Sequence, residues 1–173
     1  MQIIGFLVAN DRDKVKEKTP GKLVEFDKIV NYKKFSPTTF YSIKETLLYH
    51  RTATKLIYGS ENSENFYKMG DWDYYQIMGS QFGKIIRSLF VGDAKRGLLS
   101  FSKVFNSVIK GFNITTIEKT EKEVEIYFEN DVLYSDSYWR GFFEAYLKDL
   151  HKKGEVIVEN VSDGRRRIMV RWE

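Results

Sequence analysis

Residues 123–129 alternate strictly between polar and apolar side chains, and this alternation constrains the fold more than any other feature of the sequence. The segment reads Glu-Val-Glu-Ile-Tyr-Phe-Glu. Successive side chains of a strand point to opposite faces, so Val124, Ile126 and Phe128 are predicted to face a core. Residues 114–118 are expected to pair with this strand through a short turn. The second half of the chain therefore contains an antiparallel hairpin.

A second hairpin is predicted around the Asp-Gly pair at 163–164, because this pair favours a tight type I′ turn. A two-residue turn places Ile157 opposite Val170 and Glu159 opposite Ile168. The same register sends alternate side chains to opposite faces: Ile168, Val170 and Trp172 to the core, and Arg165, Arg167 and Arg171 to solvent.

The first two thirds of the chain has a helical period instead. Residues 2–9 are the exception, because this short apolar run is typical of a buried strand. Ser36 and Pro37 are predicted to open a helix that Gly59 ends. Further helices are predicted over residues 22–31, 72–90, 94–111 and 135–153, the last of them ending at Gly154. Helices before hairpins predict an α+β fold: helices packed on an antiparallel sheet of two C-terminal hairpins, plus a possible N-terminal strand.

Length and composition limit the class of protein. A chain of 173 residues predicts a single domain over residues 1–173, and 42% hydrophobic residues supply a core. There are no cysteines, which excludes disulfides, thiolate zinc sites and cysteine nucleophiles and fits a reducing, cytoplasmic compartment. No stretch approaches the roughly 20 apolar residues that span a bilayer.

The residue types that usually carry catalysis or bind metals do not form a recognisable pattern. His50 and His151 are far apart, and neither stands at metal-ligand spacing. His50 is interpreted as a helix-surface or partly buried residue, and His151 as part of the last turn of its helix. No strained serine elbow is present. We therefore predict no catalytic residue, no metal, no cofactor and no enzymatic activity.

Two further motifs have structural interpretations. Residues 79–85 superficially resemble a phosphate loop, but they have the wrong glycine spacing and lie within a helical pattern. Gly79 and Gly83 are instead expected to share one helix face that packs closely against another element. Asp71 or Asp73 is interpreted as a helix cap.

The chain is rich in aromatic residues, which make up 16% of it. Aromatic stripes on helices are most often core, and a closed core remains one reading here. The alternative is a ligand pocket between the helices and the sheet. Its predicted lining is Phe82, Phe101, Phe105, Trp139, Phe142, Phe143 and Tyr146.

The basic run Arg165-Arg166-Arg167, together with Arg171, is the most visible charge feature. These side chains could contact phosphates of a nucleic acid. The other predicted hairpin is rich in glutamate, so the arginines are more simply explained by ion pairs across neighbouring strands. A net charge of only +4 also favours a mixed, solvated surface.

Five short motifs follow one another over residues 35–172. They are Phe35-Ser36-Pro37-x-x-Phe40, Met69-Gly70, Gly79-x-x-x-Gly83, Tyr138-Trp139-Arg140-Gly141-Phe142-Phe143 and Val170-Arg171-Trp172. In order and spacing they resemble an uncharacterised bacterial family. That family is grouped with the superfamily of haem nitric-oxide-binding domains, four-vinyl-reductase-type sensor domains and TRAPP trafficking subunits.

The resemblance implies an α+β ligand-binding fold, often dimeric, with an apolar pocket beneath the helices. Members bind haem, small aromatic molecules or an acyl chain. This chain lacks the Tyr-x-Ser-x-Arg motif of the haem-binding branch and the cysteines of the four-vinyl-reductase branch. What the resemblance implies is therefore a pocket and a dimer, without haem or metal.

These observations lead to one leading hypothesis and two alternatives. The leading hypothesis is a non-catalytic sensor or binding module for a small apolar ligand that acts through a homodimer or a partner protein. The first alternative is a nucleic-acid-binding regulator that uses the basic C-terminal hairpin. An enzyme is the second alternative, because acid and base carboxylates leave no sequence signature.

Overall fold

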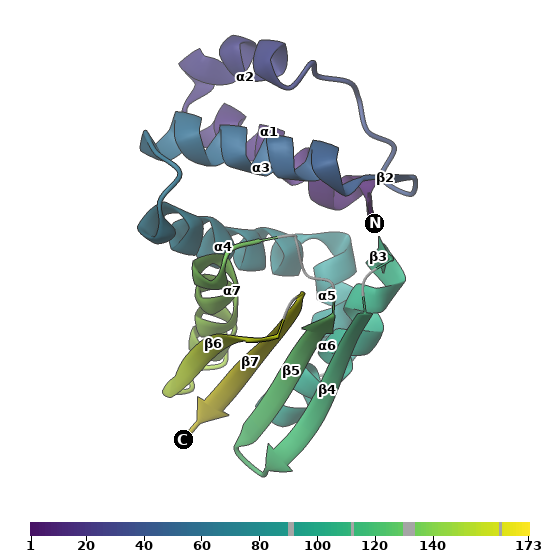
Figure 1. Cartoon of the computed structure of the whole chain (residues 1–173), viewed down its shortest axis with the longest axis vertical. Coiled ribbons are helices and arrows are strands. Elements are labelled where there is room, and N and C mark those ends of the chain that lie inside the picture. Colours follow the sequence, from purple (N-terminus) through teal and green to yellow (C-terminus); the bar gives the residue numbers. More distant parts are fainter. Residues whose placement is uncertain (90–91, 112, 130–133, 163) are drawn as a thin grey trace.

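The computed structural model describes residues 1–89, 92–111, 113–129, 134–162 and 164–173, so Asp163 of the predicted turn lies outside it. The fold is α+β (Figure 1). In chain order, its elements are β1 (Gln2–Ile4), α1 (Gly5–Lys18), α2 (Leu23–Ile29), β2 (Phe40–Ser42), α3 (Ile43–Tyr58), α4 (Ser63–Gly79), α5 (Gln81–Leu89), α6 (Ala94–Val108), β3 (Ile109–Lys110), β4 (Asn113–Thr120), β5 (Glu123–Glu129), α7 (Asp136–Asp149), β6 (Gly154–Ser162) and β7 (Arg165–Trp172).

The elements form layers that Figure 1 shows one above another. Helices α1, α2 and α3 pack together, and α4 lies between them and the rest of the molecule. The helices α6 and α7 pack against the main sheet. None of the helices within the described ranges is long and apolar enough to cross a membrane.

The main sheet has four antiparallel strands in the order β4-β5-β7-β6, which confirms the predicted sheet of two hairpins. Val124, Ile126 and Phe128 are buried, as the alternation of β5 predicts. The N-terminal strand β1 belongs to a separate small sheet with β2 and β3.

The apolar run at the N-terminus is mostly helical, which corrects the strand predicted over residues 2–9. Only three residues form β1, and α1 begins at Gly5. The buried face of α1 carries Val8, Asp11, Lys14 and Val15 at helical spacing. Two of these residues are charged, so the helix has no continuous apolar stripe from which its period could be recognised.

The helix α3 begins at Ile43, not at Pro37 as predicted. The intervening residues form a turn, in which the backbone N–H of Thr39 donates to Ser36, and then the strand β2. Because β1 pairs with β2, this segment is extended and the helix starts only after it. Gly59 ends α3 in the left-handed conformation at φ 87°, as predicted. The short helix predicted near residues 22–31 is present as α2.

The helix predicted over residues 72–90 is two helices, α4 and α5, which meet at Ser80. The Ser80 hydroxyl donates to the carbonyl oxygen of Ile77 at 2.6 Å and accepts from the backbone N–H of Gly83 at 3.1 Å. These bonds satisfy backbone groups at the end of one helix and the start of the next. Gly79 and Gly83 therefore lie in different helices and do not share a helix face.

The last two helices end earlier than predicted. α6 stops at Val108, where the chain enters β3. α7 is capped by the side chain of Ser135 and ends at Asp149, whereas Gly154 already begins β6. His151 adopts a left-handed φ of 54°, so it lies beyond the helix and not in its last turn.

The hairpin of β6 and β7 is present, but its register differs by one residue from the prediction. Ile157 pairs with Met169 instead of Val170, because the register shifts between Asn160 and Ser162. A bulge of this kind places an additional residue in one strand. The residues predicted to face the core are buried: Ile168, Val170 and Trp172.

Candidate functional site

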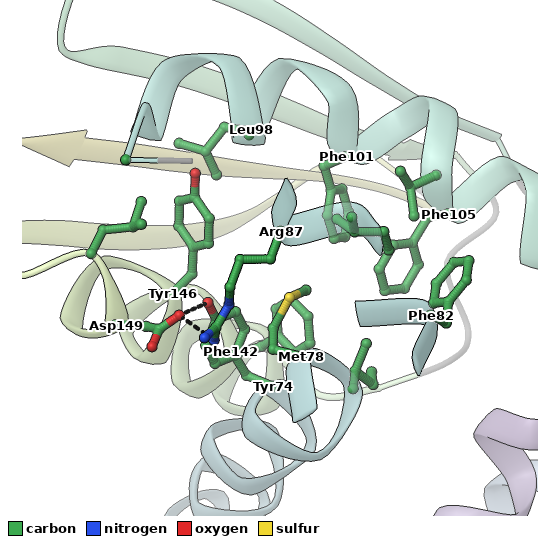
Figure 2. Close-up of a pocket in the computed structure, with 16 residues that line it drawn as sticks. Tyr74, Met78, Phe82, Arg87, Leu98, Phe101, Phe105, Phe142, Tyr146 and Asp149 are labelled. Carbon is green, nitrogen blue, oxygen red and sulfur yellow. Dashed lines mark hydrogen bonds and ion pairs between the residues drawn. The ribbon is translucent and has the colours of Figure 1, made fainter. Parts of the chain in front are cut away.

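An apolar pocket lies among helices α4, α5, α6 and α7, and Figure 2 shows the side chains around it. α6 contributes Leu98, Phe101 and Phe105, and α7 contributes Phe142 and Tyr146. Within each helix these residues recur every three or four positions, so they lie on one face. Two amphipathic helices thus direct their apolar faces into the same space.

The opposite side of the pocket is formed by the end of α4 and by α5. Ile77 and Met78 precede the break at Ser80, while Phe82 and Ile86 follow it. Because the chain changes direction at Ser80, both helices can contribute to one wall. The cavity they enclose has a volume of about 80 Å³.

One edge of the pocket is polar. Asp149 accepts hydrogen bonds from the Tyr74 hydroxyl at 2.8 Å and from the Arg87 guanidinium at 2.7 Å, and Figure 2 shows all three side chains converging. About half of the Arg87 side chain is exposed, so this ion pair lies at the rim. Burial, followed by the hydrogen bond to Asp149, raises the pKa of Tyr74 above its ordinary value.

A second tyrosine in the wall is also held neutral. The Tyr146 hydroxyl donates to the carbonyl oxygen of Ala94 at 2.8 Å, and burial raises the pKa of Tyr146 above its ordinary value. Gly97 makes room for this arrangement, because a Cβ atom there would lie 2.3 Å from the Tyr146 hydroxyl oxygen. The interior of the pocket therefore presents neutral groups, with charge confined to its rim.

Five of the seven residues predicted to bind a ligand line this pocket: Phe82, Phe101, Phe105, Phe142 and Tyr146. The other two, Trp139 and Phe143, do not line it. They are fully buried, and Trp139 packs on Phe128 of the sheet with ring centroids 4.7 Å apart. Contact with a ligand remains a prediction for the five.

The sequence analysis did not assign several wall residues to the site. Ile77 and Met78 belong to α4 and follow Tyr74 by three and four positions, a helical spacing that could have indicated them. Arg87 and Asp149 are 62 positions apart and carry no motif, so only the folded chain shows that they meet.

A buried polar cluster lies on the other side of α4, and the sequence analysis missed it. It consists of Asp11, Lys14, His50, Asp73 and Tyr138. The Lys14 ammonium donates to Asp73 at 3.0 Å, and the Tyr138 hydroxyl donates to the other oxygen of the same carboxylate at 3.0 Å. His50 Nδ1 lies 3.3 Å from an Asp11 oxygen. His50 is thus fully buried, not a surface residue, and Asp73 is an ion-pair partner, not a helix cap.

Three members of this cluster offer potential metal-ligand atoms within 4.8 Å of one another: Asp11, His50 and Asp73. Lys14, however, places its ammonium against the Asp73 carboxylate and over the Trp72 ring, 4.1 Å from the ring centroid. A divalent cation would have to approach this fixed positive charge in a medium of low dielectric constant. The cluster is therefore better described as an internal ion-pair network than as a metal site.

All four arginines of the basic hairpin have partners, but only Arg167 and Arg171 form the predicted cross-strand ion pairs with glutamates. Cross-strand ion pairs join Arg167 to Glu159 and Arg171 to Glu123. The Arg166 Nε lies 2.9 Å from an Asp136 oxygen. The Arg165 guanidinium stacks on Tyr127, 4.9 Å from the ring centroid. Nucleic-acid binding through these residues remains a prediction.

The arrangement of helices and sheet is the fold of H-NOX domains. A mutant H-NOX from T. tengcongensis is similar to this chain with a TM-score of 0.75 at 16% identity, covering 99% of this chain and 98% of that one. An oxygen-binding H-NOX domain related to soluble guanylate cyclases, in its oxygen complex, gives the same TM-score at 16% identity, covering 99% and 95%. An Fe(II) unliganded H-NOX mutant from K. algicida gives 0.71 at 13% identity, covering 99% and 97%.

Residues 30–173 match the family described as "Protein of unknown function (DUF2378)", and the chain belongs to this family. No curated protein matches the chain. The expected resemblance is confirmed: the chain belongs to an uncharacterised family, and its fold is similar to that of H-NOX domains.

The pocket residues of this chain do not fit a haem, the group that the fold implies. A haem requires an axial ligand, which is histidine, cysteine, tyrosine, or methionine together with histidine. The chain has no cysteine, and the hydroxyls of the two wall tyrosines, Tyr74 and Tyr146, are engaged with Asp149 and Ala94. Of the two histidines, His50 lies in the buried polar cluster with Asp11, and His151 is an exposed residue beyond α7. The cavity of about 80 Å³ is also smaller than the apolar cavity of about 150 Å³ that admits benzene.

Proposed function

We propose that this protein is a sensor or binding module that takes up a small, neutral, apolar molecule in the pocket among α4, α5, α6 and α7, without catalysing a reaction. The observation that carries the proposal is the cavity itself, which is enclosed by aromatic and aliphatic side chains and has its charged groups at the rim. Apolar cavities of this kind stay dry and accept apolar guests.

The pocket also selects by size and charge. At about 80 Å³ it favours molecules smaller than benzene, such as a dissolved gas or a short hydrocarbon. An ion would lose its hydration without a charged partner inside the pocket. The similarity to an oxygen-binding H-NOX domain supports a ligand of the size of a gas molecule. In this chain the ligand would bind without haem.

Xenon is a suitable probe, because it enters apolar cavities and carries no chemistry. We expect xenon to shift the methyl signals of Ile77 and Leu98 in the NMR spectrum of the native protein. Val104 lines the cavity, so Val104→Trp should fill it and abolish these shifts. Val24→Trp introduces the same side chain at a position that is 81% exposed and serves as the matched control. Unchanged methyl signals in the native protein at saturating xenon would contradict the proposal.

The natural ligand can be sought directly. An organic extract of freshly purified native protein should contain a small neutral compound that is missing from an extract of Val104→Trp. The compound should raise the melting temperature of the native protein and be recovered unchanged, because no reaction is proposed. A compound recovered in chemically altered form would indicate an enzyme.

A sensor that catalyses no reaction must transmit ligand binding to another molecule. We propose that this protein does so as a homodimer or through a partner protein. α5 is the element best placed to do this, because Ile86 lines the pocket while the neighbouring Ile85 is 64% exposed. Light scattering on the native protein tests the dimer, and Ile85→Lys should shift it towards the monomer.

A further inference from the structure

Four helices, α1, α3, α4 and α7, meet at the buried polar cluster. Asp11 and Lys14 come from α1, His50 from α3, Asp73 from α4 and Tyr138 from α7. Each of these side chains is at least nine-tenths buried. The cluster therefore links the layer of α1 and α3 to the layer of α4 and α7, which Figure 1 shows beneath it.

The formal charges of the cluster do not balance without a proton. Asp11 and Asp73 bring two negative charges, and Lys14 brings one positive charge. Lys14 and Tyr138 both donate to Asp73, whereas His50 is the hydrogen-bond partner of Asp11. An uncompensated charge in a protein interior is costly, so one additional proton on the Asp11–His50 pair is favoured.

The surroundings of the pair hold this proton in place. The rings of Phe66, Tyr134 and Tyr138 lie 5.9, 4.7 and 5.1 Å from the His50 ring. His50 Nε2 is buried and has no hydrogen-bond partner among the residues that the structure describes. Within the described part of the chain, the titratable or charged groups facing the pair are Lys14 on α1, Asp73 on α4, Tyr134 shortly before α7 and Tyr138 on α7.

We propose that the Asp11–His50 pair is a proton-dependent latch, which joins α1 to α3 where both helices pack on α4 and α7, holds while it keeps one proton and loosens as that proton is lost. Burial, more than any other factor, raises the pKa of Asp11 above its ordinary value, which agrees with a proton retained by the pair. Because His50 Nδ1 and the Asp11 oxygen are hydrogen-bonded, we assign the proton to the pair and not to one atom.

The direction of the pH dependence follows from linkage. When the cluster opens to water, a free carboxyl and a free imidazole are both deprotonated above roughly pH 6.5. A closed latch that keeps its proton at these pH values releases it on opening, so opening becomes easier as the pH rises. The closed state should therefore lose about tenfold in population relative to the open state per pH unit, until the closed pair has lost its proton as well.

Amide hydrogen exchange of the full chain between pH 6.5 and 8.5 tests the latch. Protection factors, corrected for the intrinsic chemical rate, should fall about tenfold per pH unit for Val8 in α1 and Ala53 in α3. Those of Ile126 in β5 should stay constant. Asp11→Asn, which cannot release a proton, should make the α1 and α3 values independent of pH, and Asp13→Asn on the exposed face of α1 should leave the native slope unchanged.

Three results would overturn the latch. The first is protection in α1 and α3 of the native protein that does not change with pH. The second is a slope of equal size in β5, because it would mean that the whole molecule unfolds. The third is an Asp11→Asn protein with the native slope. If Asp11→Asn does not fold, the comparison of α1 and α3 with β5 in the native protein decides alone.

Discussion

Gly83 packs so closely on the end of α4 that a Cβ atom at this position would lie 1.9 Å from the carbonyl oxygen of Ile77. For Gly79, in contrast, no non-neighbouring residue that the structure describes has an atom within 4 Å of the position of a Cβ. The two glycines of the Gly-x-x-x-Gly motif therefore have different roles, although the sequence makes them look equivalent.

Gly83→Ala is expected to destabilise the protein by about 1–3 kcal/mol, because the backbone of α5 must move away from Ile77. Gly79→Ala is the matched control. It should be neutral or stabilise by up to about 1 kcal/mol, because alanine is the better helix former. Chemical denaturation of the two variants measures both effects, and equal destabilisation by both would contradict this packing.

Gly79→Leu tests association separately. Because this position is open within the chain, the variant should fold normally. A dimer that uses the end of α4 should then dissociate, and light scattering would show a folded monomer. A variant that is still fully dimeric excludes this part of α4 from the interface.

Trp172→Ala is expected to lower the free energy of unfolding by about 3–5 kcal/mol. Trp172 is 8% exposed, and its backbone N–H donates to Lys122 at 3.1 Å. Val161→Ala, on a residue of the same hairpin that is half exposed, should change little. A melting curve for Trp172→Ala that overlays the native curve would show that the end of β7 is frayed.

The ion pair of Lys14 and Asp73 should be strongly coupled. Lys14→Met leaves a buried carboxylate without its cation, and Asp73→Asn leaves a buried ammonium without its anion. Each is expected to cost about 3–5 kcal/mol. The double variant should recover most of this loss, because it removes both charges together. Additive losses in a double-mutant cycle of denaturation measurements would argue against the pairing.

Tyr67 provides a prediction at alkaline pH. Burial, followed by its hydrogen bond to Glu144, raises the pKa of Tyr67 to about 12. A group with a raised pKa stabilises the folded state fully below its ordinary value near 10, and this stabilisation is lost as the pH rises through about 12. The difference in tyrosinate absorbance between native protein and Tyr67→Phe isolates this titration, and Glu144→Gln should move it to lower pH.

Local patterns predicted those parts of the fold that depend on neighbouring residues. The alternation around Ile126 gave a strand, and Gly59 marked the end of a helix. The helix α1 was not predicted because Asp11 and Lys14 occupy its buried face, where an amphipathic helix normally has apolar residues. The predicted register of the last hairpin was wrong because the bulge near Asn160 adds a residue to one strand, and no local sequence pattern indicates this bulge.

The residues of the candidate site were likewise predictable only in part. Aromatic residues such as Phe101 and Phe142 were recognisable from helical spacing, since an apolar face must be buried against something. Whether that face closes on a cavity depends on the break at Ser80 and on how α5 is then directed. Arg87 and Asp149 are drawn together only by tertiary structure, so no reading of the sequence alone could pair them.

The position of β7 has a consequence for biosynthesis. β7 is the last of the main strands to leave the ribosome, yet it lies between β5 and β6. Until it is made, one edge of β5 has no neighbour, and the hydrophobic side chains of Val124, Ile126 and Phe128 lack part of their cover. Exposed strand edges invite pairing with other chains. A nascent chain that stalls before Arg165 should therefore be a strong substrate for chaperones, whereas a chain synthesised past Trp172 can complete its sheet.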